Sequence, residues 1–255
     1  MDGSSIRVRC YQGWSGCLVD ISRKVHVWSL LAAEAGRRGQ PISIAVVCHA
    51  AVRALAVDGV TVAAVGPGDV HVSVFATNTL GRRLEELETT LGEGPGLQAH
   101  AEGAPVLTSD LRLNDSHWPL FGSAAAEMGV RALFAFPLRS GTVPIGVFQV
   151  YRKDAVELSP EQLGDALVLA DILSVLFLGS EGTNGHDFVQ DAISSDHHTE
   201  VFQATGMVSV QLGVSIADAL ARLRGHAFAH GRPISAVARE IVAGRLRLDE
   251  GDTDD

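Results

Sequence analysis

Hydrophobic and polar residues alternate with two different periods over residues 26–178 of this chain. Val70–Phe75 alternates strictly, as a half-buried strand does, and the apolar run Val60–Val65 before it predicts its hairpin partner. Two further apolar stretches joined by the turn Arg139–Thr142 predict a second hairpin. The expected strands cover residues 60–65, 70–75, 106–107, 131–138 and 143–151.

Stretches with a helical period separate these strands. The long helix at the end of this region has a well-marked start, because Ser159 can cap, Pro160 suits the first helical position and Gln162 completes a capping box. Hairpins interspersed with helices predict an α+β domain, with an antiparallel sheet covered by helices, and not a βαβ fold. The expected helices cover residues 26–37, 42–56, 80–91, a short segment ending near 102, 118–128, and a long stripe from Ser159 to Phe177.

The end of the chain combines small residues with medium apolar residues at helical spacing. Breaks at Ser215 and at Gly231-Arg-Pro233 predict three short, closely packed helices, an all-α domain. Residues 1–24 show no period, which leaves an unstructured extension or a misassigned start codon as explanations. The expected organisation is an N-terminal extension at 1–25, a first domain at 26–178, a linker at 179–198 with a helical bridge at 187–195, the helical domain at 199–248, and an acidic tail at 249–255.

Charge is distributed unevenly along the chain. The net charge is −10, which argues against a polyanion-binding surface over the whole protein. Residues 199–248 nevertheless carry six arginines against three acidic residues, and they form a net-basic block. Such charge suits contacts with nucleic-acid phosphates, although arginines on amphipathic helices also describe ordinary solvated faces.

The sequence gives no sign of a membrane segment or of a disulfide framework. No apolar run reaches the roughly 18 residues that span a bilayer, and no signal-peptide core is present, so we expect a cytoplasmic protein. Three cysteines, Cys10, Cys17 and Cys48, are expected to be reduced thiols.

Motifs for catalysis or metal binding are also missing. The sequence has no Walker loop, no G-x-S-x-G and no H-E-x-x-H, so we expect no enzyme, no cofactor and no metal site. Asp196-His-His198 could bind a metal, but adjacent side chains on a helix diverge. His100 and His117 could ligate haem, but packing or hydrogen bonding is the more ordinary role. Glu85-Glu86-Leu-Glu88 is interpreted as a charged helix face and not as a paired-carboxylate site.

A set of short motifs in the first domain is typical of one family. On these motifs residues 26–178 resemble a GAF domain, which implies a sensor or dimerisation module. One departure is Gly96, where the family often has a cysteine, so covalent or redox chemistry at this position is not expected. The motifs are Thr90-Leu-Gly-Glu-Gly-Pro95, Gly103-Ala-Pro-Val-Leu107, Asp110-Leu111, Trp118-Pro-Leu-Phe121, Gly129-Val-Arg-Ala-Leu-Phe-Ala-Phe-Pro-Leu-Arg139, Ile145-Gly-Val147 and Tyr151-Arg152.

The helical domain has its own set: Ala204-Thr-Gly-Met207, Ala219-Leu-Ala-Arg-Leu-Arg-Gly-His-Ala227, Arg232-Pro-Ile234 and Val237-Ala238. With these marks it resembles an ANTAR domain, the RNA-binding module of bacterial antitermination regulators. The resemblance implies a dimeric, signal-responsive antiterminator that binds leader stem-loops in RNA. The alternative is a dimeric GAF sensor or scaffold that binds a protein partner without RNA.

Candidate site residues follow from these resemblances. A small molecule in the GAF pocket would lie between the sheet and the helices at 80–102 and 118–128. The apolar stripe Leu163–Phe177 is expected to hold a homodimer, so that Leu173→Glu or Leu176→Glu would weaken it. Removing Arg224 and Arg232 together is expected to weaken RNA binding. The ligand candidates are Ser73, Phe75, His117, Trp118 and Phe136, and the RNA candidates are Gln203, Gln211, Arg222, Arg224, His226, His230, Arg232 and Arg245.

Overall fold

The computed structural model describes residues 21–66, 70–113, 117–179 and 196–248. The helical bridge expected at 187–195, the acidic tail and the first 20 residues lie outside the described residues. The first helix begins at Ile21, so the end of the expected extension belongs to this helix.

The first domain is built on a five-stranded antiparallel sheet with the order β2-β1-β5-β4-β3. Both predicted hairpins are confirmed, and β1 joins them by pairing with β5. This pairing sets Gly59 opposite Tyr151, whose ring would lie 2.4 Å from a Cβ at Gly59, so a side chain there would collide with it. The strands are β1 (Gly59–Gly66), β2 (Val70–Ala76), β3 (Val106–Thr108), β4 (Ala132–Ser140) and β5 (Val143–Arg152).

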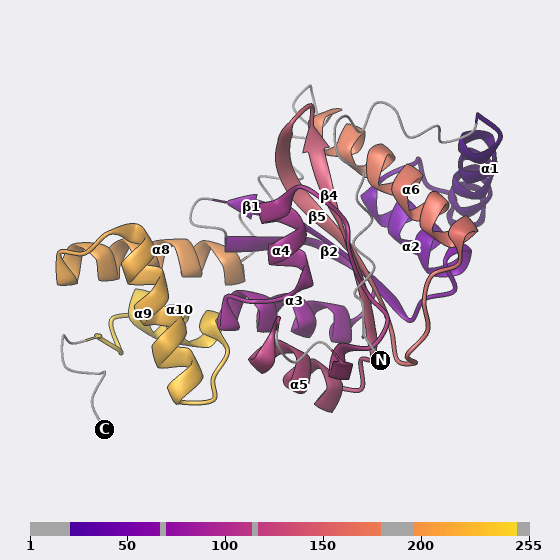
Figure 1. Ribbon diagram of the computed structural model, residues 1–255. Helices are drawn as coiled ribbons and strands as arrows, with labels where there is room; N and C mark the ends of the chain where they lie inside the picture. Colours follow the sequence, from indigo (N-terminus) through magenta and orange to yellow (C-terminus); the bar gives the residue numbers. More distant parts are fainter. Residues whose placement is uncertain (1–20, 67–69, 114–116, 180–195, 249–255) are drawn as a thin grey trace.

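Helices cover both faces of this sheet (Figure 1). One face packs against α2 (Ile44–Ala54) and α6 (Pro160–Gly179), and α1 (Ile21–Arg38) packs on these two helices. The other packs against α3 (Thr79–Leu91), α4 (Pro95–Glu102) and α5 (Pro119–Glu127), with a short 3₁₀ turn at Leu111–Leu113. Alternate residues of each strand enter the two cores, as the period of two requires.

The start of α6 confirms the predicted capping box. The Ser159 hydroxyl accepts from the Gln162 amide at 3.2 Å, and the Gln162 side chain accepts from the Ser159 amide at 3.0 Å. Further along the helix, Leu173 is fully buried in the core of its own domain, while Val175 and Leu178 are exposed. The prediction that Leu173 belongs to a surface contact is therefore wrong, because the sheet already covers that side of the helix.

Three helices form the C-terminal domain: α8 (Asp196–Leu212), α9 (Ile216–Ala229) and α10 (Ile234–Val242). Ser215 caps α9 by accepting from the Asp218 amide at 3.1 Å, and Gly213 and Gly231 turn the chain with positive φ. Buried alanines, including Ala204, Ala219, Ala227 and Ala238, let the helices pack closely around a common core. Figure 1 shows this domain beside α3, away from α1, α2 and α6.

Among the described helices, none is by itself long and apolar enough to cross a membrane. The pair Glu200–Leu212 and Ile216–Ala229 meets the test only when taken together, and it is bent by 107°.

Candidate functional site

Helix α3 lies between the sheet and the C-terminal helices. Asn78 caps it by accepting from the Gly81 amide at 2.9 Å, and Gly92, with φ of +70°, ends it in the left-handed conformation. One side of α3 packs on β1 and β2, and the other contacts α9 and α10. It is therefore one element through which the two domains meet.

The Leu-Gly-Glu-Gly-Pro motif after α3 has a structural role at nearly every position. Gly92 closes α3, Gly94 has φ of +150°, and Pro95 is the first residue of α4. The Glu93 carboxylate accepts from the amides of Leu120 and Phe121 at 2.7 and 2.8 Å, which caps the N-terminus of α5. The motif thus fixes three helices against one face of the sheet.

Two carboxyl groups on α3 are buried against the sheet. Glu88 is fully buried and accepts from the Gly96 amide at 2.7 Å and from the Gln149 side chain at 2.6 Å. Burial raises the pKa of Glu88 to about 7, partly offset by these hydrogen bonds. Burial likewise raises the pKa of Glu85 to about 8, partly offset by the hydroxyls of Ser73 and Thr61.

These carboxyls correct the interpretation of Glu85-Glu86-Leu-Glu88 as a solvated helix face. Only Glu86 of the three points toward the C-terminal domain, while Glu85 and Glu88 lie within the first domain. A signal was present in the sequence, because Gly81, Leu84, Glu85 and Glu88 recur at spacings of three and four around one helix face.

The glycine at position 96 follows from this buried pair. A Cβ at Gly96 would lie 1.7 Å from Nε2 of Gln149 and 2.6 Å from Oε2 of Glu88. A cysteine, which the family often has there, would have to displace the amide–carboxyl pair. The departure noted in the sequence therefore has a packing cause.

The predicted ligand residues do not come together. Ser73 and the buried Trp118 lie on the α3–α5 side of the sheet, and His117 is exposed. Phe75 and Phe136 belong to the opposite core, so the prediction that they line the space under α3–α5 is wrong.

The error concerns which face of the sheet each strand residue points to. When both faces of a sheet are covered by apolar residues, the composition of a strand does not show which residues point to which face. A register shift between Val62 and Ala63 changes the alternation once more. In the structure the Phe75 ring lies 5.6 Å from His49 of α2, and the Phe136 ring lies 5.8 Å from Phe148. The residues that were missed on the α3 side are Glu85, Glu88 and Gln149.

A cleft of about 610 Å³ opens between the two domains. It lies between α3 and α5 on one side and the end of α9 with the turn into α10 on the other. Its size falls in the range of small-molecule sites, and domain boundaries are common places for such sites. Its walls include Arg83, Glu86, Leu87, Leu120, Met128, Phe228 and Arg232.

Polar contacts cross from α3 to the C-terminal helices. Nε of Arg224 donates to the Thr89 carbonyl at 2.8 Å, and the Ile234 amide donates to the Thr90 hydroxyl at 3.2 Å. The Ser235 hydroxyl donates to the Glu86 carboxylate. In addition, Val70 of β2 is buried in the same cluster as the core of the C-terminal helices.

The predicted RNA residues differ in their contacts. Gln203, Arg222 and Arg245 are exposed, whereas Arg224 is engaged with α3 and Arg232 forms a bidentate ion pair with Glu240 at 2.9 and 3.0 Å. Arg224 and Arg232, whose joint removal is expected to weaken RNA binding, therefore both have partners within the protein.

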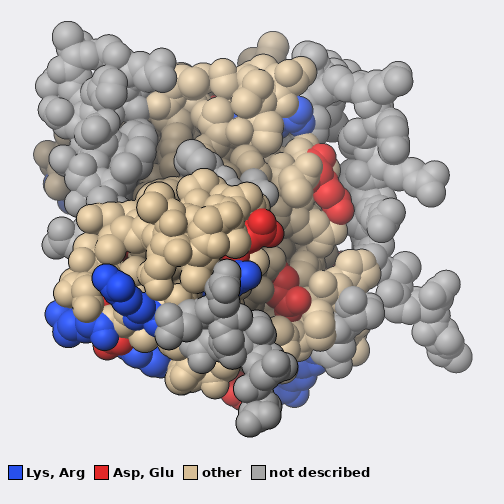
Figure 2. All heavy atoms as spheres, turned by 90° about the vertical axis from the view of Figure 1, so that its left-hand side faces the viewer, with Lys and Arg blue, Asp and Glu red and all other residues tan. Residues whose placement is uncertain are grey.

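The remaining candidates make contacts within the C-terminal domain. The rings of His226 and His230 stack at 4.1 Å, and Gln211 donates to the Leu248 carbonyl at 2.7 Å. Figure 2 looks toward this side of the molecule and shows basic side chains gathered at the lower left. The exposed arginines of residues 199–248 are Arg222, Arg239, Arg245 and Arg247.

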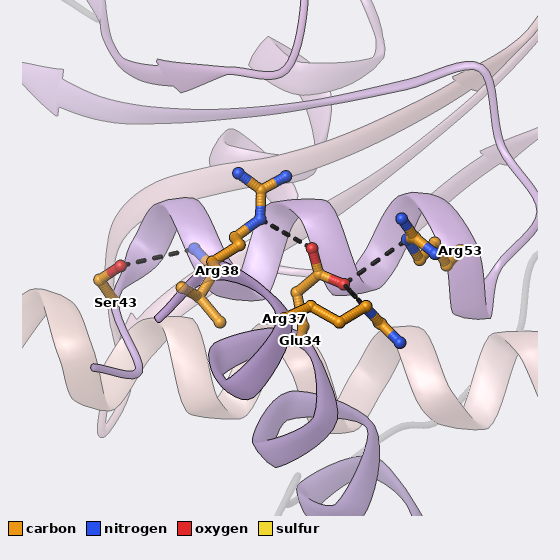
Figure 3. Close-up of polar contacts among 6 residues, drawn as sticks. Glu34, Arg37, Arg38, Ser43 and Arg53 are labelled. Carbon is orange, nitrogen blue, oxygen red and sulfur yellow. Dashed lines mark hydrogen bonds and ion pairs between the residues drawn. The ribbon is translucent and has the colours of Figure 1, made fainter. Parts of the chain in front are cut away.

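A separate charged cluster joins α1 to α2 (Figure 3). The buried Glu34 carboxylate pairs with Arg37, with Arg38 at 2.7 Å and with Arg53 at 3.5 Å. Hydrogen bonds from Arg37 and then Arg38 lower the pKa of Glu34 to about 2. The cluster lies on the face of the sheet opposite α3, and we assign it a structural role.

Glu34→Gln is expected to lower the free energy of unfolding near pH 7 by only about 1 kcal/mol, because the three guanidinium groups are largely solvated. The folded-state pKa is lowered, so the ionic contribution is present above about pH 4.5 and is lost as the pH falls toward about 2. Urea unfolding should therefore separate wild type from variant near neutrality and bring them together in acid. A constant difference across this range would contradict the assignment, and the exposed Glu102→Gln is the matched control.

Within the described ranges, no three His, Cys, Asp or Glu side chains are grouped so that they could hold a metal ion. Cys48 is buried, and burial raises the pKa of its thiol. Cys10 and Cys17 lie outside the described residues.

Comparison with known proteins concerns the first domain. The GAF domain family matches residues 41–177, more than half of the chain. The GAF domain of a phosphoenolpyruvate-protein phosphotransferase from Acinetobacter is 12% identical, covering 62% of this chain and 95% of that chain with a TM-score of 0.47. The GAF domain of a two-component sensor histidine kinase from Bacillus halodurans is 13% identical, with coverage of 55% and 97% and a TM-score of 0.42. Among curated proteins there is no match to this chain.

Proposed function

The chain belongs to the GAF domain family, whose members are typical of signal-sensing proteins, and on this premise we propose that it is a signal-responsive RNA-binding regulator of transcription antitermination. The GAF domain receives the signal, and the C-terminal helices bind RNA. No catalytic step is part of this proposal.

The observation that carries the proposal is a net-basic three-helix domain placed directly against the sensor. Its residues 199–248 carry six arginines against three acids, in a chain of net charge −10. Arginine side chains bind phosphates, which position an RNA without reading its sequence. The motifs that resemble ANTAR fall in the same helices, with their alanines in the core.

In this function the protein acts as a dimer on paired stem-loops of leader RNA. Sequence-specific RNA readers favour single-stranded loops, where bases are unstacked and their edges are accessible. Holding such stem-loops would prevent a terminator hairpin from forming, so that transcription continues. The partners are therefore leader RNA, a second copy of the chain, and an unidentified small molecule that acts on the GAF domain.

A dimeric sensor or scaffold that binds a protein without RNA is the alternative. It is favoured by exposed apolar side chains on α1 and α6, which pack together on one side of the GAF domain. Exposed apolar patches mark interaction surfaces. The residues are Ile21, Val25, Trp28, Val175 and Leu178.

Two exposed arginines of the C-terminal helices, Arg222 and Arg245, are available to contact RNA phosphates. Arg222→Ala combined with Arg245→Ala removes two exposed arginines, whereas Arg224 and Arg232 are engaged within the protein. We expect the double variant to bind a pool of fluorescein-labelled RNA hairpins with randomised loops more weakly. We also expect the slope of the log binding constant against the log salt concentration to become shallower by about 1.5 to 2, because two phosphate contacts are lost.

The matched control is Arg82→Ala combined with Arg112→Ala, which makes the same charge change at exposed positions of the GAF domain. Equal effects of the two double variants would mean that only net charge matters. RNA binding by neither wild type nor control would favour the scaffold alternative.

A further inference from the structure

At the junction between α3 and the C-terminal helices, each domain provides hydrogen-bond partners for one helix end of the other domain. The last carbonyls of any α-helix have no partner within the helix. At the end of α3, the Thr89 carbonyl accepts from Arg224 of α9 at 2.8 Å. A cation at this end also interacts favourably with the helix dipole. The C-terminal domain thus supplies a cap for a helix of the sensor.

In return, residues of α3 provide hydrogen-bond partners for the start of α10. Its N-cap residue is Pro233, which has no side-chain acceptor, so the first amides of α10 need partners from elsewhere. The Thr90 hydroxyl accepts from the Ile234 amide at 3.2 Å, and the Glu86 carboxylate accepts from the Ser235 hydroxyl. A carboxylate beside a helix N-terminus is favourable. The sensor therefore caps α10 in return.

These contacts are not peripheral. Ile234 is 1% exposed and Thr90 is 7% exposed, so the hydrogen bond between them is shielded from water. Losing a buried hydrogen-bond partner is costly, because the remaining group stays desolvated. We call the three contacts, Arg224–Thr89, Ile234–Thr90 and Ser235–Glu86, the α3 latch.

We propose that the α3 latch holds the C-terminal helices in a closed arrangement that withholds them from RNA, and that RNA binds when the latch opens. The proposal rests on the RNA-binding function proposed above. In the closed arrangement the Arg224 guanidinium is bonded to α3. The Glu86 carboxylate lies at the start of α10, where it repels an approaching phosphate.

The location of the latch also explains how the sensor controls it. Glu86, Thr89 and Thr90 stand on the same helix as the buried Glu85 and Glu88. Any ligand or charge change that shifts α3 against the sheet shifts all three latch acceptors together, since a helix moves as a rigid unit. Sensing and release therefore use the two sides of one helix.

The test uses the full-length chain with Glu86→Gln and Thr90→Val, which alter only the sensor side of the latch. The matched control is Glu102→Gln with Thr79→Val, which makes the same changes at exposed positions of the GAF domain that do not line the cleft between the domains. Hydrogen exchange of the first turn of α10 reports opening, and the RNA-hairpin pool described above reports binding. Far-ultraviolet circular dichroism checks that the fold is kept.

We expect the latch variant to exchange the first amides of α10 at least about tenfold faster than wild type and control. We expect it to bind the hairpins at least about fivefold more tightly, the lower end of ordinary coupling between sites. If the first amides of α10 exchange at the wild-type rate in the latch variant, the proposal that these contacts hold α10 closed is overturned. Faster exchange with RNA binding equal to that of wild type would overturn the closed arrangement as an inhibited state while leaving RNA binding intact. Faster exchange with no RNA binding by any form would overturn both this inference and the proposed function.

Discussion

Leu173→Glu is expected to unfold the GAF domain, whereas Val175→Glu, two residues away, is expected to leave it folded. Leu173 is fully buried between α6 and the sheet, and Val175 is 67% exposed on the outer side of the same helix. A glutamate at Leu173 would place a charge in an apolar core and lose the packing of a leucine, at a cost of about 4 kcal/mol or more. Circular dichroism and urea unfolding measure this difference.

The same pair tests the predicted homodimer. Val175 is one of the exposed apolar residues on α1 and α6, so a charge there is expected to weaken self-association if this side of the GAF domain holds the dimer. Light scattering at micromolar concentration should show a dimer for wild type and a shift toward monomer for Val175→Glu. Val143→Glu, at an exposed valine on the β4–β5 hairpin, is the control and should remain dimeric. A monomeric wild type would rule out this interface.

The second large effect is a loss of stability as the pH rises. Unfolded glutamates titrate near pH 4.5, whereas the folded-state pKa values of Glu85 and Glu88 are raised to about 8 and about 7. Between these limits the folded chain holds protons that the unfolded chain has released. The contribution of these two groups to the free energy of unfolding is therefore largest at and below about pH 4.5. This contribution falls as the pH rises toward about 8.

Glu85→Gln is expected to remove much of this slope and to stabilise the protein near pH 8 by about 2 kcal/mol, because no charge needs to form in the core. Glu88→Gln is expected to behave differently. Its carboxyl accepts two hydrogen bonds, and an amide would set a donor against the Gln149 amide or the Gly96 N–H. Urea unfolding near pH 5 and near pH 8 compares the three proteins. A wild type that is equally stable at both values, and no change on Glu85→Gln, would contradict this assignment.

Much of the local structure could be predicted from the sequence because it depends on neighbouring residues. The capping box at Ser159 and the breaks at Ser215 and Gly231 are decided within a few positions. The two hairpins are of the same kind. Each was expected from alternation and turn residues, and each is present.

The site could not be predicted in the same way, because it depends on contacts between distant parts of the chain. Arg224 and Thr89 are 135 residues apart, and neither has a local feature that indicates the other. Phe75 and Phe136 satisfy any apolar pattern, so only the paired sheet decides which core they enter. Glu85 and Glu88 have the helical spacing of buried residues, but their charge favours the solvated interpretation.

The central claim is that the C-terminal helices bind RNA, and ultraviolet crosslinking in cells followed by sequencing of the bound RNA tests it most directly. If these helices bind RNA, the full-length protein recovers a restricted set of leader stem-loops, and the Arg222→Ala, Arg245→Ala variant recovers fewer of them while being equally abundant. Recovery of no RNA above an untagged strain, together with intact dimers, would show that the C-terminal helices do not bind RNA and would leave a GAF sensor that acts on a protein partner.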